Sequence, residues 1–349
     1  MSVGQTMQID PKLFAKLPGP LVGWFRTHAR ALPWRLDPSP YFVWLSEIML
    51  QQTRIETVRS YFERFRTALP DIPALAAADE EQVFKLWEGL GYYSRAKNLH
   101  AAAKVIMGKH QGRFPETFAE VRALPGIGDY TAGAICSIAF GLPEPAVDGN
   151  VMRVVARLAA FEGDVRSAAI RKEVTEGLRK VYPRGAESEF TQALMELGEV
   201  VCTPAGSPDC LHCPLAEFCA ARAEGKADRL PVPPEKKPRP VEKRTVLILR
   251  CRKRIALRKR PDRGLLANLW EFPSLDGWKA KKDVAEFLGG LPVRKGPTAV
   301  HVFSHLAWDM ISFSAELPEE SDEYSWFEPD HLPAVPSAFR VFRDTISKF

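Results

Sequence analysis

Apolar residues recur at helical spacing through most of the first 220 residues, and Pro and Gly separate the apolar segments from one another. This pattern predicts helices over residues 20–30, 41–66, 80–88, 95–110, 116–123, 130–140, 151–160, 168–181 and 188–201. No segment before residue 240 shows the apolar–polar alternation that is typical of a strand. The first region is therefore predicted to be all-α.

The pattern changes after residue 224. Residues 225–243 contain five prolines and many charges, which is typical of a linker. The following TVLILRCRKRIALRKR predicts two short strands with a tight basic connection, and PTAVHVFSHLAWDMISFSAEL and DEYSWFEP also favour strands. Helical spacing returns at 279–288 and 336–347. Residues 244–349 are therefore predicted to form an α+β domain.

Length and composition limit the possible classes of protein. A chain of 349 residues suits about two domains. With 46% hydrophobic and 26% charged residues, a mostly disordered chain is excluded. The apolar runs are too short to span a membrane, and the N-terminus lacks the pattern of a signal peptide. We therefore expect a soluble protein in the reducing cytoplasm.

Charge is distributed unevenly along the chain. The net charge is only +5, yet residues 226–263 contain 15 basic residues against four acidic ones. Such a cluster suits the phosphate backbone of a nucleic acid or another anionic surface. A solvated basic linker would have the same composition, so charge alone does not identify the partner.

Four of the six cysteines lie within eighteen residues, with gaps of seven, two and five residues: Cys202, Cys210, Cys213 and Cys219. In a reducing compartment, thiols this close are typical metal ligands rather than disulfide partners. Four thiolates suit either zinc or a [4Fe–4S] cluster, and the spacing does not distinguish the two. Unpaired thiols remain the plain alternative.

The segment ALPGIGDYTAGAI places Gly126 and Gly128 between two predicted helices. Glycines allow a tight turn and let backbone N–H groups approach an anion at the start of the next helix. This is the chemistry of a helix-hairpin-helix that binds a DNA phosphate. A plain turn between helices is the alternative.

Two carboxylates are candidates for acid–base chemistry. Glu47 lies in a strongly apolar helical stretch, where burial should raise its pKa and keep it able to donate a proton near neutral pH. Leu50 and Gln51, three and four residues later, should share its helical face. Asp148 and Asn150 directly precede a predicted helix, so Asp148 is either a catalyst or simply an N-cap. Glu47 could also be a carboxyl that core hydrogen bonds satisfy.

Taken together, these features resemble the helix-hairpin-helix superfamily of endonuclease III, and within it the adenine DNA glycosylase (MutY) family. The resemblance extends from about Leu21 into the C-terminal domain. The motifs that carry it are LPWR (32–35), WLSEIMLQQT (44–53), WEGLGYYSRAKNLH (87–100), VDGNV (147–151), QALMELG (192–198), GLLANLWEFP (264–273) and FSH (303–305). Their joint occurrence is highly specific.

The resemblance implies a monofunctional glycosylase that flips out and hydrolytically removes adenine mispaired with 8-oxoguanine or guanine. Glu47 would protonate adenine N7, and Asp148 would stabilise the oxocarbenium-like sugar, as paired carboxylates do in glycosidases. Tyr130 and Asn150 would line the sugar and orient these groups. The other implied contacts are with the adenine (Trp34, Arg35, Gln192), with the opened duplex (Leu50, Gln51, Tyr92) and with 8-oxoguanine (Phe303, Ser304, His305).

The resemblance also implies an architecture and a cofactor. A six-helix barrel would occupy about 30–140, and the N-terminal helix with 141–224 would form a lobe that holds a [4Fe–4S] cluster on the four cysteines. The C-terminal domain would be Nudix-like, but the acidic Nudix box is absent from this sequence. That domain should therefore recognise the oxidised base rather than hydrolyse nucleotides. The expected partner is double-stranded DNA with such a mispair, bound by a monomer.

Two other interpretations remain at this stage. An endonuclease III-like bifunctional glycosylase/lyase would act on oxidised pyrimidines, but it needs a lysine where this chain has Tyr130, and it lacks the C-terminal domain. A non-catalytic DNA-binding protein could hold zinc on the same four cysteines. The pair of Glu47 and Asp148 argues against that interpretation.

Overall fold

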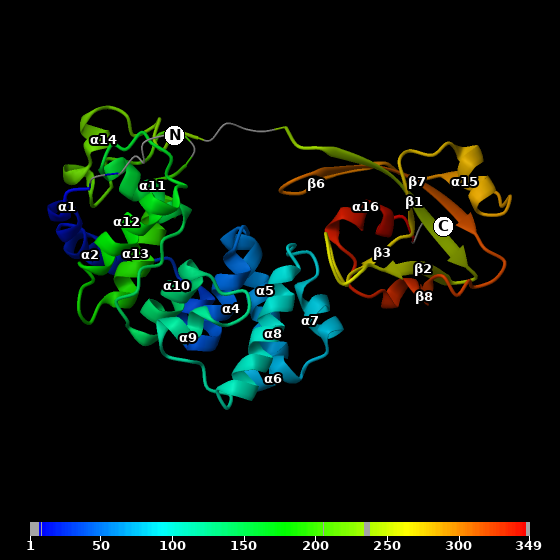
Figure 1. The fold of residues 1–349 in the computed structure, drawn as a ribbon, viewed down its shortest axis with the longest axis horizontal. Helices are drawn as coiled ribbons and strands as arrows, with labels where there is room; N and C mark the ends of the chain where they lie inside the picture. The colour runs from blue at the N-terminus through cyan, green and yellow to red at the C-terminus, as the bar shows by residue number, and fades with distance from the viewer. Residues whose placement is uncertain (1–6, 8, 205, 234–237, 347–349) are drawn as a thin grey trace. The chain divides into compact units, whose positions relative to one another are not determined.

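Helices make up the chain as far as residue 223, and a mixed β-sheet with flanking helices follows from residue 241 (Figure 1). The computed structural model describes residues 7, 9–204, 206–233 and 238–346. Contacts divide the chain into two units, one of residues 1–77 and 98–235 and the other of residues 78–97 and 236–349. A short helical segment from the first half of the chain thus packs with the C-terminal sheet.

The first unit consists of helices joined by short turns. Pro40 begins the helix that carries Glu47, and Gly141 ends the helix that carries Tyr130 in a left-handed conformation, so both helix ends follow local sequence signals. The helices are α1 (Pro11–Ala15), α2 (Pro18–His28), α3 (Pro33–Leu36), α4 (Pro40–Leu50), α5 (Ile55–Ala68), α6 (Ile72–Ala77), most of α8 (Ser94–Lys109), α9 (Phe118–Arg122), α10 (Asp129–Phe140), α11 (Gly149–Leu158), α12 (Ala168–Arg179), α13 (Glu187–Val200), η1 (Ala216–Phe218) and α14 (Ala220–Ala223).

The helix predicted over 41–66 was wrong in one respect, because it is broken into α4 and α5. Helix α4 ends at Leu50, and Gln52 then adopts a positive φ of 55°. A left-handed residue cannot continue a right-handed helix, so the chain turns before Ile55. Four short helices were also missed, namely α1, α3, α6 and α14, each of them six residues or shorter.

Helix α10 is central to the packing of the first unit, because it packs against α4, α9 and α13. Helix α13 also packs against α2 and α11, and their apolar faces form a core that includes Leu21, Val151, Val155, Phe190 and Leu194. The helices that carry the predicted catalytic side chains are therefore buried neighbours. Their backbone positions are fixed by packing.

The second unit is built on an eight-stranded mixed sheet. The strands are β1 (Val241–Cys251), β2 (Arg254–Lys259), β3 (Trp270–Glu271), β4 (Ser274–Asp276), β5 (Arg294–Lys295), β6 (Ala299–Val302), β7 (Ala307–Glu316) and β8 (Ser325–Phe327). The central path is β3-β2-β1-β7-β5, with β4 on β1, β6 on β7 and β8 on β2. Among the strand pairs of the described residues, β1–β7 alone is parallel, with Val246 opposite Ser312.

Both faces of this sheet are covered. Val246 and Ile248 of β1 pack against Phe339 and Phe342, at the start of and within α16 (Arg340–Arg343), whereas Leu247 and Leu249 face α15 (Lys281–Phe287). The continuous apolar run of β1 follows from burial on both sides. The remaining helical elements of the second unit are α7 (Glu80–Trp87), the first turn of α8, η2 (Pro329–His331) and η3 (Ser337–Phe339).

Some predicted boundaries in the second unit were wrong. Strand β1 begins at Val241, inside the segment expected to be linker, because it pairs with β7 from its first residue. The helix expected over 336–347 is a 3₁₀ turn followed by a single α-helical turn within the described residues. No helix among the described residues is long and apolar enough to cross a membrane.

Candidate active site

A cavity of about 290 Å³ in the first unit brings together most of the predicted catalytic and adenine-binding residues. They come from α3, α4, α10, α11 and α13 and from the turn before α11. The predicted residues in its wall are Trp34, Arg35, Glu47, Leu50, Tyr130, Asp148, Asn150 and Gln192. Side chains that lie far apart in the sequence thus face one small space.

Glu47 lies on a helix that is buried almost all around, and its own side chain is only 6% exposed. The Tyr130 hydroxyl donates a hydrogen bond of 2.7 Å to Glu47 Oε2. The pKa of Glu47 is raised from 4.5 to about 7, and burial is the main cause. The charge of Asp148 adds to this rise, whereas the hydrogen bond from Tyr130 and the charge of Arg35 oppose it. A carboxyl with this pKa can hold a proton near neutral pH, as the sequence predicted.

Asp148 is both an N-cap and a wall of the cavity. Its Oδ1 accepts a hydrogen bond of 2.8 Å from the Val151 backbone N–H at the start of α11, and its Oδ2 accepts one of 2.9 Å from Asn150 Nδ2. Burial raises its pKa, although these hydrogen bonds and the charge of Arg153 oppose the effect. The two interpretations left open by the sequence are therefore compatible.

A glycine on α13 lets the turn before α11 approach closely. A Cβ at Gly198 would lie 2.6 Å from Asn150 Cβ, a distance that real contacts essentially never show. Any larger residue at this position would push α13 away from Asn150 and thereby shift the Asp148 carboxylate that Asn150 holds. Gly198 therefore belongs to the packing that sets the geometry of the cavity.

Glu196 is a site residue that the sequence analysis missed. Its side chain is 2% exposed; Oε1 accepts a hydrogen bond of 2.7 Å from Arg30 Nε, and Oε2 accepts one of 2.9 Å from Arg35 Nη2. Arg35 Nε also donates to Gln192 Oε1 at 2.9 Å. Burial would raise the pKa of Glu196, but the two guanidiniums outweigh it and lower the pKa to about 2. Its position four residues after Gln192, on the same helical face, was the available signal.

The cavity therefore contains two buried glutamates in opposite states. Glu47 has a pKa of about 7, whereas Glu196 has one of about 2 and stays ionised. A pair of carboxyls whose environments separate their pKa values in this way is typical of sites that assign acid and anion roles to different side chains. Glu47 is the only one of the two suited to donate a proton at neutral pH.

The raised pKa of Glu47 predicts how stability depends on pH. The folded protein holds this proton more tightly than the unfolded chain, so Glu47 destabilises the fold progressively as pH rises from about 4.5 to about 7. A rise of this size corresponds to about 3 kcal/mol. Replacing Glu47 by Gln removes the effect, so the melting temperature of Glu47→Gln should exceed that of the wild type at pH 8 and approach it at pH 4.5. Melting curves with the same separation at both pH values would contradict the assignment.

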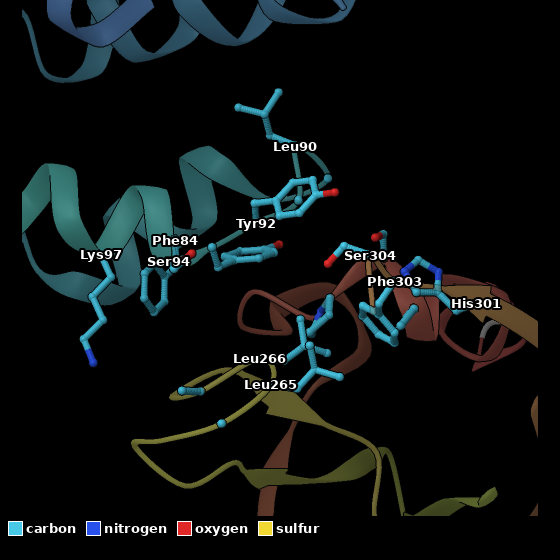
Figure 2. Close-up of a pocket in the computed structure, with 18 of the residues that line it drawn as sticks. Phe84, Leu90, Tyr92, Ser94, Lys97, Leu265, Leu266, His301, Phe303 and Ser304 are labelled. Carbon is cyan, nitrogen blue, oxygen red and sulfur yellow. The ribbon is translucent and has the colours of Figure 1, made fainter. Parts of the chain in front are cut away.

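A second cavity, of about 650 Å³, lies in the second unit and contains the other group of predicted residues. Figure 2 shows side chains of the 84–97 segment on one side of it and Ser304, Phe303 and His301 on the other. The predicted residues in its wall are Tyr92, Phe303, Ser304 and His305. Apart from Gln51, the predicted catalytic and base-binding residues thus lie in two cavities, one in each unit.

The loop from β6 to β7 presents this second group. The Phe303 N–H donates to the Leu306 carbonyl at 2.8 Å, which closes a tight turn and leaves Ser304 and His305 exposed at its tip. The Phe303 ring packs edge-on against the Trp308 ring, with 4.9 Å between centroids. Trp308 is fully buried, so it anchors the turn to the core of the sheet.

Gln51 does not share the helical face of Glu47 as predicted, because α4 ends one residue earlier. Leu50 lines the first cavity together with Glu47, but Gln51 is not part of its wall. Instead, Gln51 Nε2 donates a hydrogen bond of 3.2 Å to Thr131 Oγ1 on α10. The expectation of a shared face was correct for Leu50 and wrong for Gln51.

The turn between α9 and α10 contains the two predicted phosphate-binding glycines. Both are exposed, Gly126 has a φ of +75°, and Gly128 is the N-cap of α10. Arg122 bonds to Asp129 and donates to the Ile127 carbonyl, so the turn is held from within. The backbone conformation is the tight turn that the glycines predicted.

The four clustered cysteines line one small cavity of about 20 Å³ beside α11. Arg157, which is 2% exposed, donates from Nη1 to Cys202 Sγ at 3.1 Å, and burial raises the pKa of Cys213 to about 11. Among the described residues, no group of three or more His, Cys, Asp or Glu side chains is arranged so that it could hold a metal ion. The chemistry of these residues nevertheless suits a metal cofactor bound by four cysteine thiolates, because the buried Arg157 guanidinium would offset part of their negative charge.

Comparisons with known proteins agree with the two-part organisation. Residues 45–180 match the family described as HhH-GPD superfamily base excision DNA repair protein, and residues 244–342 match the NUDIX domain family. Adenine DNA glycosylase of Buchnera aphidicola subsp. Acyrthosiphon pisum is 31% identical over 327 residues, which cover 89% of this chain and 92% of the relative. The chain belongs to the adenine DNA glycosylase family.

Other members of the adenine DNA glycosylase family match at similar levels. The Schizosaccharomyces pombe enzyme is 36% identical over 398 residues, covering 90% of this chain and 85% of the relative. The human enzyme is 34% identical over 356 residues, covering 82% of this chain, and the match spans 64% of the human protein's length. The family predicted from the sequence motifs is therefore confirmed.

Solved structures resemble the helical part of the chain. A thermostable thymine-DNA glycosylase superposes with a TM-score of 0.55 at 26% identity, covering 61% of this chain and 97% of the other. A trapped endonuclease III–DNA covalent intermediate gives 0.53 at 24% identity, covering 62% and 99%, and this second likeness shows the fold alone. The predicted fold, a helical glycosylase region followed by a Nudix-like domain, is confirmed.

Proposed function

We propose that this chain is a monofunctional glycosylase that removes adenine mispaired with 8-oxoguanine or guanine. The observation that carries the proposal is the 290 Å³ cavity, where Glu47, Tyr130 and Asp148 face one another and where Glu47 has a pKa of about 7. Membership in the adenine DNA glycosylase family supports the same activity. Adenine must leave the base stack to enter such a cavity, at a cost of a few kcal/mol.

Glu47 is proposed as the general acid. The Tyr130 hydroxyl donates a hydrogen bond to Oε2, so the acidic proton of Glu47 resides on the other oxygen and is available to the base. Protonation of adenine at N7 lets the base depart as a neutral molecule, because the electrons of the glycosidic bond no longer have to carry a full negative charge. Tyr130 has a strongly raised pKa and keeps its own proton throughout.

Asp148 is proposed to stabilise the positive charge that develops on the sugar. Its carboxylate is fixed by the Val151 N–H and the Asn150 amide, so it requires no reorganisation when the charge appears. Preorganised charge of this kind is more effective in a buried site than in water. Water then completes the hydrolysis at the sugar carbon.

The polar wall formed by Arg35, Gln192 and Glu196 is proposed to recognise adenine, with Trp34 as its apolar floor. Arg35 joins the two α13 side chains through hydrogen bonds of 2.9 Å each, so the three groups are held as one network. Trp34 is 7% exposed and packs edge-on against Phe62 at 5.4 Å. A planar base that offers both donors and acceptors suits this combination.

The second cavity is proposed to receive the base opposite adenine. Ser304 and His305 offer polar groups at the exposed tip of the β6–β7 turn, and Phe303 offers a ring face beside them. Tyr92, 46% exposed, lies in the wall of this cavity and is proposed to insert into the duplex together with Leu50 and Gln51. 8-Oxoguanine differs from guanine in one acceptor and one donor, which such groups can distinguish.

We propose that Cys202, Cys210, Cys213 and Cys219 hold a [4Fe–4S] cluster. When bound, the cluster would cross-link the loop after α13 to the end of the helical unit. Purified protein should absorb near 400 nm, and Cys213→Ser should lose that absorbance, whereas Cys251→Ser should keep it, because Cys251 lies in the sheet of the second unit. Stoichiometric zinc in a colourless wild type would contradict the proposal.

DNA binding is proposed to involve two further parts of the chain. The exposed turn at Gly126 and Gly128 is proposed to bind a phosphate, and the basic residues of 226–263 to contribute non-specific affinity for double-stranded DNA. The division into a barrel (30–140), a cluster lobe (141–224), a linker (225–243) and a base-recognition domain (244–349) is part of the same proposal. So are a monomeric state and a cytoplasmic location.

A strand-cleavage assay tests the proposed activity against its alternatives. Duplexes would contain adenine opposite 8-oxoguanine, adenine opposite guanine, or thymine glycol, and each would be analysed with and without alkali. We expect cleavage of the two adenine duplexes only after alkali, because a monofunctional enzyme leaves an abasic site. Nicking of the thymine glycol duplex without alkali would indicate a bifunctional enzyme, and no cleavage at all would indicate a binding protein.

A further inference from the structure

The helix that precedes Tyr92 is tied to the C-terminal part of the second unit by a cluster of charged groups. Glu88 Oε1 accepts a hydrogen bond of 2.7 Å from Arg343 Nη1 and one of 3.3 Å from the Val335 backbone N–H. Lys85 Nζ donates to Glu88 Oε2 at 2.9 Å and to the Leu332 carbonyl at 3.1 Å. Glu88, Lys85 and Arg343, with the two backbone groups, are called the Glu88 clamp below.

The clamp joins segments that are about 250 residues apart in the sequence, since 255 positions separate Glu88 from Arg343. The Glu88 side chain is only 16% exposed, so solvent screens its pair with Arg343 less than it screens a pair on the open surface. Glu88 also satisfies the N–H of Val335, which is 3% exposed. Loss of the carboxylate would leave that buried donor and the guanidinium without this acceptor.

The clamp lies directly behind the second cavity. One wall of that cavity is formed by residues 89–94, which follow Glu88, and another by Pro336, Ser337 and Ala338, which follow Val335. Figure 2 shows the first of these walls facing the turn that carries Ser304. The distance between the wall of residues 89–94 and the wall of residues 336–338 is therefore set by the contacts that hold Glu88 to Val335 and Arg343.

We propose that Glu88 is a positioning residue for recognition of the base opposite adenine. It holds the segment that carries Tyr92 against residues 335–338. The next residue, Phe339, packs against Trp308, which anchors the turn that carries Ser304, so the clamp preorganises the second cavity before DNA arrives. Without the clamp the two walls separate more readily, and binding must restore their spacing. The inference rests on the proposed function for its ligand, but not for the contact itself.

The functional test compares Glu88→Ala, Arg343→Ala and the double variant in the full-length chain. The readout is the ratio of dissociation constants for duplexes with an uncleavable adenine analogue opposite guanine or opposite 8-oxoguanine. We expect Glu88→Ala to reduce the preference for 8-oxoguanine about tenfold, and Arg343→Ala to reduce it by less, because Glu88 then keeps its bonds to Val335 and Lys85. The double variant should reduce it no further than Glu88→Ala, because the contact with Arg343 is already lost in that variant. Arg343→Lys should restore part of the preference.

The matched control is Glu63→Ala, which removes an exposed pair with Arg66 of the same 2.7 Å length on α5 of the first unit. It should leave the preference unchanged. The saturating rate of adenine release opposite guanine should stay within about twofold of the wild type in all clamp variants, since Glu88 does not line the first cavity. An unchanged preference in Glu88→Ala, or losses that multiply in the double variant, would overturn the proposal.

Hydrogen exchange provides a readout that needs neither DNA nor activity. In Glu88→Ala the backbone amides of residues 332–338 should exchange about tenfold faster than in the wild type, and Glu63→Ala should not change them. Unchanged exchange would show that Glu88 does not hold this segment, and would overturn the proposal. A wild type that releases no adenine would instead contradict the proposed function, while the exchange result would still decide whether the clamp acts.

Discussion

Glu47→Gln is expected to lower the rate of adenine release by about 10³- to 10⁴-fold, the upper part of the range for loss of a general acid. Gln has nearly the shape of Glu and keeps an oxygen that can accept the Tyr130 hydroxyl, so the cavity should stay intact. Only the acidic proton is lost. The measurement is single-turnover release of adenine from a duplex with adenine opposite 8-oxoguanine.

Binding separates a loss of chemistry from a loss of fold in this variant. Glu47→Gln should bind the mispaired duplex within about threefold of the wild type, and Glu63→Gln, on the exposed surface, should change neither binding nor rate. A Glu47→Gln variant that releases adenine at a rate close to the wild type would show that another group donates the proton.

Asp148→Asn should slow adenine release by about 10²- to 10³-fold, because a neutral amide cannot balance the positive charge that develops on the sugar. The substitution separates the two roles that the structure gives to Asp148. Asn is as good an N-cap as Asp, so α11 should begin at the same residue and the fold should stay intact. The measurement is again the single-turnover rate at saturating enzyme.

Circular dichroism and the melting temperature should confirm that Asp148→Asn is folded, with a melting temperature within a few degrees of the wild type. If the folded variant releases adenine at the wild-type rate, Asp148 serves only to cap α11. Asp148→Ala, which removes both the charge and the cap, should lose the same activity and also about 1 kcal/mol of stability.

Local sequence patterns were enough to predict the features that depend on neighbours in the chain. The apolar residues around Glu47 predicted its burial and raised pKa, because a helix that is apolar on all sides must lie in a core. The position of Asp148 before an apolar helix predicted the cap. The two glycines predicted the tight turn at 126–128.

Features that depend on distant contacts could not be predicted in the same way. Glu196 is one of several acidic residues on α13, and only its pairing with Arg30 and Arg35, more than 160 residues away, distinguishes it. The break after Leu50 has no proline or glycine to mark it, because a non-glycine residue, Gln52, takes the left-handed conformation. In both cases tertiary structure overrides the local pattern.

The division of the candidate residues between two cavities also required the structure. The motif at 87–100 lies within the helical region of the sequence, yet Ala78–Lys97 packs with the C-terminal sheet. Nothing in the spacing of this segment reveals that Glu88 meets Arg343. Tyr92 therefore shares a cavity with Ser304 rather than with Glu47.

The pH dependence of adenine release tests most directly whether Glu47 in the first cavity performs the chemistry. Free adenine would be quantified between pH 5 and 9, with saturating enzyme and a duplex that has adenine opposite 8-oxoguanine. Because the protonated form of Glu47 is the active one and its pKa is about 7, the rate should fall above pH 7, approaching tenfold for each further pH unit. A rate that stays constant to pH 9, or the absence of released adenine at every pH, would contradict this account.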